Sequence, residues 1–357
     1  MKDPKVVGVV VSRDDWGLLA VSIAHALTNH VDEVFVLDHA STDQTAVGLR
    51  YLQSLWPERI RVLRSNATHF EQEAATNAVA HLALESSPDW IHVFDSDEFL
   101  LVGPDTSLKQ VLASMTPDKV ALRYSVNNFI SPRHFDEHST IGYRALRVRA
   151  KPTRQYDDTQ AARSLYYGSA TFFDFPFVSK LIFRARELTR VTAGAHRVMH
   201  FGGQGVEHRD DRVQCAHLTL PSRQKLERKA KQGEIYVRMG MPENFGWQAQ
   251  LMYRLQQEGR LDWFWARHSF ANDTVNTGIP MPHEIDHTLA LALESALQFL
   301  ERKFQSTDLR TIDGAPIDCG NESTSSISLD QAIGLCAALQ RQTDVLVQHI
   351  RQSGAKR

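Results

Sequence analysis

Several features are scarce in this chain, and each scarcity excludes a class of protein. The 357 residues contain only three cysteines, Cys215, Cys319 and Cys336, which lie far apart in the sequence. This pattern predicts neither a disulfide framework nor a cysteine-rich zinc site, and it is typical of a reducing compartment. No apolar run reaches the roughly 18 residues of a membrane span, and the first apolar run is too short for a signal peptide. We therefore expect a cytoplasmic protein that contacts a membrane peripherally at most.

The chain also lacks a strong net charge and the common phosphate-binding glycine motifs. Its formal net charge is −2, which argues against a general nucleic-acid binder. Neither Gly-X-Gly-X-X-Gly nor Gly-X-X-X-X-Gly-Lys-Ser/Thr occurs, so the phosphate cradles of dinucleotide-binding and P-loop proteins are absent. A nucleotide would instead be held by a metal ion on its diphosphate and by carboxylates on its base and ribose.

The first 100 residues alternate between strand and helix patterns. Apolar runs predict buried strands at residues 6–11, 33–37, 60–63 and 91–94, and apolar residues at helical spacing lie between them. This alternation predicts an α/β fold with a mainly parallel sheet. In such sheets ligands bind beyond the carboxyl ends of the strands. Polar clusters follow three of these strands, and they are Arg13-Asp14-Asp15, Asp38 and Asp95-Ser96-Asp97.

Asp95 and Asp97 are the strongest candidates for a ligand site. They come directly after a buried strand and are two positions apart, so extended backbone would point both carboxylates the same way. Paired hard oxygen ligands suit a divalent cation that carries phosphates. For an isolated Asp-X-Asp the usual alternative is an acidic turn that caps the next helix. The convergence of three polar clusters at one sheet edge favours the ligand interpretation.

These clusters resemble the motifs of family 2-type glycosyltransferases with the GT-A fold. The likeness is closest to the bacterial subgroup with an Asp-X-Asp-Glu-Phe motif, which here is Asp95 to Phe99. The resemblance implies a GT-A-like (Rossmann-like) sheet domain over residues 1–220. It also implies transfer of a sugar, with inversion, from a nucleotide-diphosphate sugar to a hydroxyl on a glycan or lipid-linked acceptor. A UDP-sugar is the expected donor, and Mn²⁺ or Mg²⁺ is the expected cofactor.

The resemblance also assigns roles at the donor side. Asp38 would contact the nucleotide base, Asp95 the ribose or the metal, and Asp97 would ligate the metal. Arg13 and Asp14 would join them in binding the donor. The subgroup usually carries an Asn-Glu pair after its first strand, and this chain has Asp14-Asp15 there.

Two further residues match elements that the subgroup carries later in the chain. Lys180 opens a strand-like run and would neutralise phosphate charge, and His196 follows a glycine and would supply a third metal ligand. His200 and His217 are the alternatives for that ligand. The segment 215–222 resembles the subgroup's closing His-aromatic-X-X-X-Ser element, with leucine in place of the aromatic residue. Its serine is expected to cap the next helix.

The acceptor side offers several candidates for the catalytic base. Asp174 is the first choice because it sits among aromatic residues, although such aromatics belong to a core more often than to a sugar site. The other candidates are Asp136, Glu137, Asp157 and Asp158. Residues 133–163 show little periodicity and are expected to form a long loop.

Beyond the sheet domain, residues 221–282 are expected to form a basic helix and an irregular connector. The basic helix would present either a solvated face or a contact with an anionic lipid or polymer acceptor. Residues 283–357 are expected to contain two amphipathic helices that cover the catalytic domain or a second subunit. His283 to His287 spells His-Glu-X-X-His, but its position at a helix start and the charge of Asp286 argue against a zinc protease.

Two other functions were weighed against glycosyl transfer. A sugar nucleotidyltransferase should show a glycine-rich activation loop near the N-terminus, and none is found. A catalytically inactive binding scaffold is disfavoured because the carboxylate set is intact.

Overall fold

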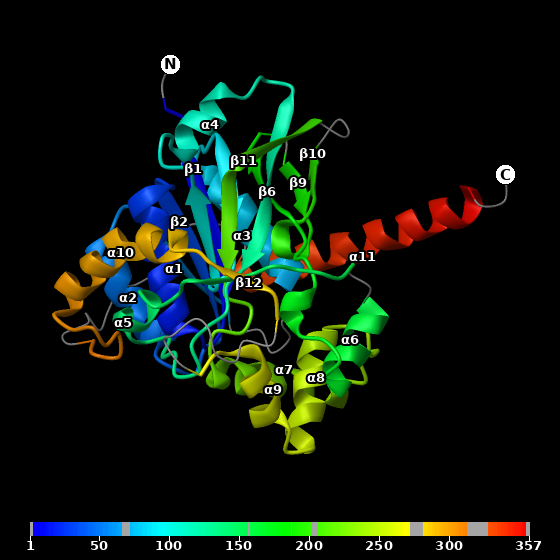
Figure 1. Ribbon diagram of the computed structural model, residues 1–357. Coiled ribbons are helices and arrows are strands. Elements are labelled where there is room, and N and C mark those ends of the chain that lie inside the picture. The colour runs from blue at the N-terminus through cyan, green and yellow to red at the C-terminus, as the bar shows by residue number, and fades with distance from the viewer. Residues whose placement is uncertain are drawn as a thin grey trace.

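The computed structural model describes residues 3–65, 72–155, 158–186, 188–200, 206–271, 281–312 and 328–354. An eight-stranded sheet forms its centre, in the order β3-β2-β1-β4-β8-β6-β11-β5 (Figure 1). The strands are β1 (Val6–Ser12), β2 (Glu33–His39), β3 (Ile60–Ser65), β4 (Trp90–Val93), β5 (Glu98–Val102), β6 (Lys119–Asn128), β8 (Lys180–Arg184) and β11 (Val206–His217). Strands β3, β2, β1 and β4 are parallel, as are β6 and β11, whereas β8 and β5 run antiparallel to their neighbours. The α/β prediction with a mainly parallel sheet is confirmed.

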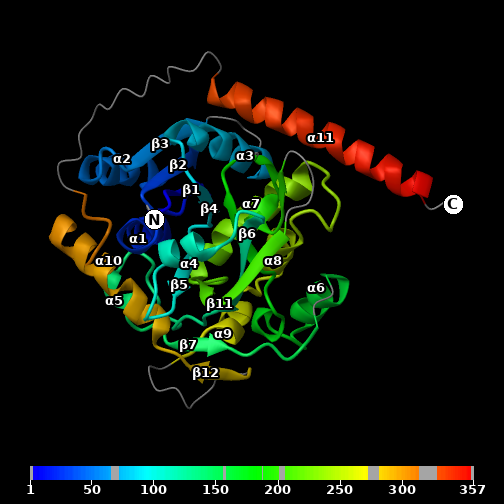
Figure 2. The same ribbon diagram turned by 90° about the horizontal axis from the view of Figure 1, so that it is seen from above.

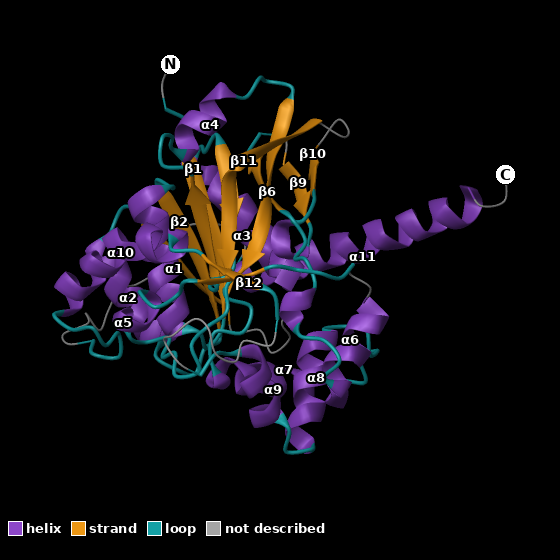
Figure 3. Cartoon of the chain, in the orientation of Figure 1, coloured by secondary structure: helices purple, strands orange, loops and turns teal. Residues whose placement is uncertain are grey.

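Helices pack on both faces of this sheet because its central strands are apolar on both sides (Figure 3). In β1, Val6 and Val10 pack into the core on one face, while Val7 and Val9 pack into the core on the other. The first face is covered by α1 (Trp16–Asn29), α2 (Thr45–Leu55), α4 (Leu108–Ser114) and α10 (Thr288–Phe304). The second face is covered by α3 (Gln72–Ala83), α11 (Leu329–Gly354) and the hairpin of β9 (Leu188–Val191) and β10 (Val198–His200).

A group of helices lies beyond one end of the sheet, as Figure 1 shows. We call it the helical unit, and it consists of α6 (Asp158–Tyr167), α7 (Arg223–Arg238), α8 (Trp247–Gln257) and α9 (Leu261–His268). Ser222 caps α7 by accepting from the Lys225 N–H at 3.0 Å, as the sequence predicts. Helices α7 and α8 touch backbone to backbone, because a Cβ at Gly233 would lie only 2.0 Å from the Ala249 carbonyl oxygen.

The structure differs from the sequence prediction in the connector. Residues 241–282 contain the helices α8 and α9, whose buried apolar residues recur at helical spacing and pack against α7. Tryptophan and glycine in this segment, which suggested irregular structure, instead supply a packed side chain and a turn at Gly246. The predicted loop at 133–163 likewise contains α5 (Thr140–Tyr143), β7 (Val148–Ala150) and most of α6.

The His-Glu-X-X-His segment begins as a short strand and ends at the start of a helix, since His287 is the N-cap of α10. Residues His283–Ile285 form β12, which pairs antiparallel with β7, and Glu284 forms ion pairs with Arg149 and Lys151. Its two histidines therefore do not share a helix face, which agrees with the rejection of a zinc protease site.

The two C-terminal helices pack on the sheet domain itself. Helix α10 lies against α1, and the Trp16 indole N–H donates to the Leu309 carbonyl at 2.8 Å. The beginning of α11 packs on α3, and the rest of α11 extends away from the body of the molecule (Figure 2). Among the described residues, no helix is long and apolar enough to cross a membrane.

Candidate functional site at the carboxyl edge of the sheet

Charged side chains from distant parts of the chain meet beyond the carboxyl ends of β1, β2, β4 and β11. Asp15 follows β1, Asp38 ends β2, the Asp95 to Glu98 turn joins β4 to β5, and His217 ends β11. Their convergence follows from the parallel arrangement of β1, β2 and β4, which places the ends of these strands at one edge.

Asp15 links this edge of the sheet to helix α7. Its carboxylate accepts from the Ser96 hydroxyl and from the Lys225 ammonium, and Arg228 donates to its second oxygen at 2.9 Å. Burial disfavours the charged carboxylate, but Lys225 and Arg228 outweigh that effect and hold the pKa of Asp15 below its ordinary value. Arg228 also pairs with buried Glu137 at 2.6 Å. One face of the basic helix is therefore turned into the acidic edge instead of being solvated.

Lys180 is fully buried and lies between two carboxylates. Its ammonium is 2.8 Å from Asp95 and 2.5 Å from Glu98. Burial raises the pKa of Glu98 to about 7, because Lys180 only partly compensates for the lost solvation. Burial disfavours the charge on Lys180 too, but the two carboxylates more than offset this and raise its pKa. Lys180 thus binds the Asp95 to Glu98 turn, and its contact with the donor phosphates stays a prediction.

Asp97 and His217 face each other across the site. Asp97 is buried, and one of its carboxylate oxygens lies 3.7 Å from His217 Nε2. The other ring nitrogen, Nδ1, is 3.1 Å from the Asn128 side-chain oxygen, which also accepts from Thr219 at 2.6 Å. Nδ1 therefore donates its hydrogen, and the lone pair of Nε2 points at the Asp97 carboxylate.

The protonation of this pair follows from its burial. Burial lowers the pKa of His217 well below its ordinary value, and Lys180 and Lys229 add to that effect. Burial raises the pKa of Asp97, with Lys225 and Lys229 opposing it. At neutral pH His217 is therefore uncharged, and its Nε2 lone pair faces Asp97.

Asp38 has an unused acceptor atom. It is 1% exposed, and one carboxylate oxygen accepts from the Ser41 N–H at 3.0 Å. The other oxygen, Oδ2, lies 3.9 Å from the Arg64 guanidinium and has no hydrogen-bond partner among the described residues. A buried acceptor without a partner calls for an explanation, and a ligand donor is a direct one.

Arg13 and Asp14 occupy more peripheral positions than the sequence predicts. Asp14 adopts a left-handed backbone conformation with φ at 51°, which turns its carboxylate onto the loop after β2. There it accepts from the Thr42 N–H at 2.6 Å and the Asp43 N–H at 3.2 Å. Arg13 is exposed, and its closest ionic contact is Asp14 at 3.7 Å. Asp15 is the member of this cluster that enters the site.

Asp174, predicted as the catalytic base, is a capping residue here. Its carboxylate accepts from the backbone N–H of Thr171 at 2.6 Å and from its hydroxyl at 2.9 Å, which closes a short 3₁₀ turn at Phe172–Asp174. We therefore do not retain it as the base. Of the other candidates, Asp136 pairs with Arg310 at 2.8 Å. Asp157 and the side chains of Asp158 and His200 lie outside the described residues.

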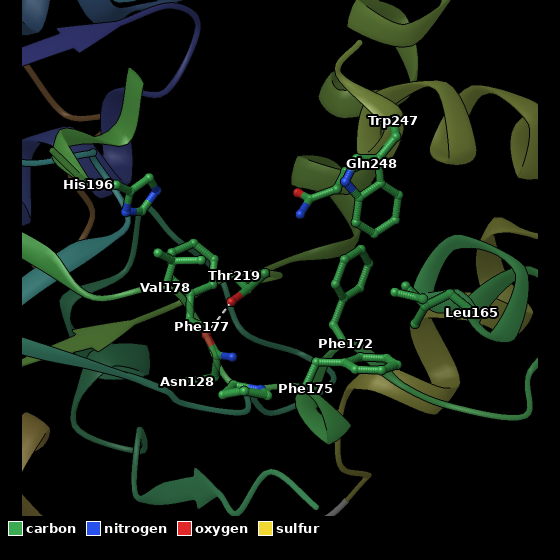
Figure 4. A pocket seen from close by; sticks show the side chains of 12 residues that line it. Asn128, Leu165, Phe172, Phe175, Phe177, Val178, His196, Thr219, Trp247 and Gln248 are labelled. Carbon is green, nitrogen blue, oxygen red and sulfur yellow. Dashed lines mark hydrogen bonds between the residues drawn. The ribbon is translucent and has the colours of Figure 1, made fainter. Parts of the chain in front are cut away.

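His196 lines a pocket between the sheet edge and the helical unit (Figure 4). Its Nδ1 lies 3.0 Å from the Ser179 carbonyl oxygen, which can only accept, so Nδ1 carries the hydrogen and Nε2 the lone pair. Burial lowers the pKa of His196, so the ring is neutral at pH 7. The described contacts bring His217, and not His196, to Asp97.

Within the described ranges, no three histidine, cysteine, aspartate or glutamate side chains form a ready-made metal cluster. Lys180 holds Asp95, and the Lys225 ammonium lies 3.9 Å from the second Asp97 oxygen. The Asp97 and His217 atoms that face each other nevertheless suit a divalent cation, since carboxylate oxygen and neutral imidazole are both ligands of Mn²⁺. The residues present therefore fit the predicted cofactor.

Three cations on α7 were not predicted as site residues. Lys225, Arg228 and Lys229 recur at the three- and four-residue spacing that places side chains on one helix face. Lys229 donates to the Thr219 carbonyl at 3.3 Å, and it is close enough to Asp97 for the two charges to interact. The spacing was visible in the sequence, but nothing in it showed which face of the helix turns inward.

Comparison with known proteins defines the class of this protein. The profile of glycosyltransferase family 92 matches residues 13–248, well over half of the chain. The chain belongs to glycosyltransferase family 92. A comparison with curated proteins finds no match.

Several solved glycosyltransferases show a distant likeness. The mannosyltransferase PcManGT from Pyrobaculum calidifontis, solved with GDP-Man and Mn²⁺, is 14% identical, with a TM-score of 0.36 over 98% of this chain and 81% of that chain. TarS 1-349 from S. aureus is 13% identical, with a TM-score of 0.30 over 51% of this chain and 47% of that chain. Glucosyl-3-phosphoglycerate synthase from Mycobacterium tuberculosis, solved with Mg²⁺ and UDP, is 15% identical, with a TM-score of 0.25 over 34% of this chain and 44% of that chain.

Proposed function

We propose that this protein transfers a sugar from a nucleotide-diphosphate sugar to a hydroxyl acceptor, with a divalent cation as cofactor. The observation that carries the proposal is the pair of acceptor atoms, Asp97 Oδ1 and His217 Nε2, that face each other at 3.7 Å. Asp97 and His217 would hold the cation, because a carboxylate oxygen and a neutral imidazole each offer it a lone pair. When bound, Mn²⁺ or Mg²⁺ stabilises the negative charge that develops on the departing diphosphate.

The nucleotide is held by the donor side of the edge. The unpaired Oδ2 of Asp38 accepts a hydrogen bond from an N–H of the base, which uracil and guanine both offer. Lys229 approaches the diphosphate from α7. Its ammonium donates to the Thr219 carbonyl and is close enough to Asp97 for their charges to interact. Asp95 completes the carboxylate pair of the Asp-X-Asp motif. The motifs at the sheet edge resemble those of family 2-type enzymes, for which a UDP-sugar is the expected donor, so uridine is the first base to test.

His196 takes the role of catalytic base that is predicted for Asp174. The acceptor hydroxyl oxygen bonds to the anomeric carbon, the bond from that carbon to the diphosphate oxygen breaks, and the hydroxyl proton moves to His196 Nε2. A neutral imidazole with a free lone pair in the acceptor pocket is suited to that transfer. The sugar inverts its anomeric configuration, because the hydroxyl attacks opposite the leaving group.

Calorimetry of nucleotide binding tests this function. UDP and GDP are titrated into the protein with Mn²⁺ and with a chelator, in the wild type and in Asp97→Asn. We expect Mn²⁺-dependent binding that the substitution weakens about 10-fold or more, because a charged ligand is lost while the shape is conserved. Asp105→Asn, on an exposed loop, is the matched control and should bind as the wild type does. Equal affinity in Asp97→Asn would overturn the cation assignment.

A further inference from the structure

The pocket beside His196 has walls of two different kinds, as Figure 4 shows. Its volume is about 180 Å³. The wall on the sheet side carries Asn128, His196 and Thr219, and Gln248 of α8 faces them across the opening. The opposite wall is formed by α6, α8 and the turn before β8, and it is hydrocarbon for most of its extent.

The polar wall adjoins His217, the residue that faces Asp97. Asn128 and Thr219 both contact His217 Nδ1, at 3.1 Å each, and the Phe177 ring lies 4.4 Å from the His217 ring. An acceptor hydroxyl at this end of the pocket is therefore close to the group that faces Asp97. The His196 Nε2 atom and the Gln248 amide make no hydrogen bond within the described part of the chain, so they are available to hydroxyls.

The apolar wall suits a hydrocarbon group rather than the hydroxyls of a sugar. Leu165, Phe172 and Phe175 line it, and the Trp247 ring stacks on Phe172 at a centroid distance of 5.9 Å. These side chains offer large hydrophobic surfaces and few polar atoms, so a hydroxylated sugar ring would lose hydrogen bonds there. Val178 lies at the rim, where it is 51% exposed.

The volume limits what the pocket can hold. Pockets for drug-sized ligands usually measure about 300–1,000 Å³, so this one encloses a single ring-sized group, and a sugar joined to that group lies at the mouth and reaches the polar wall with its hydroxyl. A ring-sized apolar group joined to a sugar matches both walls at once.

We propose that the acceptor is a glycoside whose sugar carries a ring-sized apolar aglycone, and that the apolar wall is the subsite for this aglycone. This inference rests on the proposed function, because it names the acceptor class of the same site. The sugar hydroxyl lies at the polar wall near His196, and the aglycone lies against Phe175 and Leu165. Burial of the aglycone then contributes binding energy that the matching methyl glycoside lacks.

The test is the direct binding of phenyl and methyl β-glycosides of glucose, galactose, mannose and N-acetylglucosamine, measured by calorimetry in the presence of Mn²⁺ and UDP or GDP. We expect at least one phenyl glycoside to bind about 10-fold more tightly than its methyl counterpart. Leu165→Ala shortens the apolar wall, and it should lower the ratio of phenyl to methyl glycoside affinity several-fold. Val206→Ala, at 52% exposure on β11, is the matched control and should leave that ratio unchanged.

The outcomes separate this inference from the proposed function. If phenyl and methyl glycosides bind equally to the wild type, or if Leu165→Ala leaves the ratio of their affinities unchanged, the aglycone subsite is wrong even when the nucleotide binds with Mn²⁺. If no nucleotide binds, the proposed function fails, but a phenyl preference that Leu165→Ala lowers still supports the apolar subsite. Circular dichroism of both variants verifies that the fold is retained.

Discussion

At the scale of single residues, the two histidines of the site have different expected roles. His217→Ala removes a proposed metal ligand, so Mn²⁺-dependent binding of the nucleotide should fall about 10-fold or more. His196→Ala removes the proposed base, so nucleotide binding should persist while turnover falls by about 10²-fold or more. Calorimetry measures the binding, and sugar transfer or hydrolysis of the donor measures the turnover.

The roles assigned to His217 and His196 depend on the difference between these two variants. If His196→Ala loses Mn²⁺-dependent binding and His217→Ala keeps it, then His196 is the third ligand, as its sequence position suggests. His134→Ala, which lies outside the site, serves as the control for a general effect of removing a histidine.

Lys229 permits a second residue-scale prediction. Its ammonium faces the acidic edge without a carboxylate at ion-pair distance among the described residues, whereas Lys225 and Arg228 are bound to Asp15. Lys229→Met should therefore weaken nucleoside diphosphate binding about 10-fold, the effect of losing one charge-assisted hydrogen bond. Lys231→Met, on the exposed face of the same helix, should have no effect in the same titration. Equal effects would indicate general attraction by the basic helix.

The sequence predicts where the candidate site lies in the fold, but it does not predict how the side chains there are oriented. Asp38, Asp95 and Asp97 lie at the carboxyl edge as predicted, because the ends of buried parallel strands determine where they fall. Asp14 and Asp15 are adjacent, and only the left-handed turn at Asp14 decides that Asp15 enters the site. Such a turn is rare for a residue other than glycine, and the sequence gives no sign of it.

At the scale of secondary structure, α10 is part of the core of the sheet domain. Leu293 is fully buried against α1, whereas Leu291 on the opposite face is 74% exposed. Leu293→Ala should lower the free energy of unfolding by about 2–5 kcal/mol. Leu291→Ala should change it by less than about 0.5 kcal/mol. Urea denaturation of the two variants measures this difference, and equal values would mean that α10 detaches from the sheet domain in solution.

The elements were predictable where periodicity was strong. The first four strands appear as predicted because β-branched runs bounded by polar turns leave few alternatives. The helices α8 and α9 were not predicted because they have only 11 and 8 residues, so their helical spacing recurs over few turns. Strand β12 was missed because its pairing with β7 joins segments more than 130 residues apart, and a single sequence carries no signal for that contact.

At the scale of the whole molecule, buried neutral histidines make stability depend on pH. Burial lowers the pKa of six histidines, to about 3 for His92 and about 4 for His268. The other four are His25, His30, His196 and His217. Below the ordinary histidine pKa of 6.5 the unfolded chain binds protons that the folded chain does not, so stability is lost as the pH falls. Each such group costs about 1.4 kcal/mol per pH unit in that range.

Glu98 acts in the opposite direction, since its folded pKa of about 7 lies above its unfolded value. The folded state then binds the extra proton, and this contribution is lost as the pH rises toward 7. Burial raises the pKa of Asp97 too. Two carboxyl groups thus oppose six histidines, so we expect the free energy of unfolding to fall by several kcal/mol between pH 7 and pH 5.5. Urea denaturation at the two pH values measures the change, and net proton uptake on unfolding is the independent sign. A stability that does not change with pH would mean that these histidines are solvated.

The contact between α1 and α10 has a consequence for synthesis on the ribosome. Helix α1 leaves the exit tunnel early, but the helix that covers its apolar face and the Leu309 carbonyl that binds Trp16 are about 280 residues further along the chain. At translation rates of about 5–20 residues per second, the apolar face of α1 stays exposed for roughly 15–60 s before α10 is synthesised. Chaperones that hold exposed apolar segments are therefore expected to associate with the nascent chain until α10 emerges.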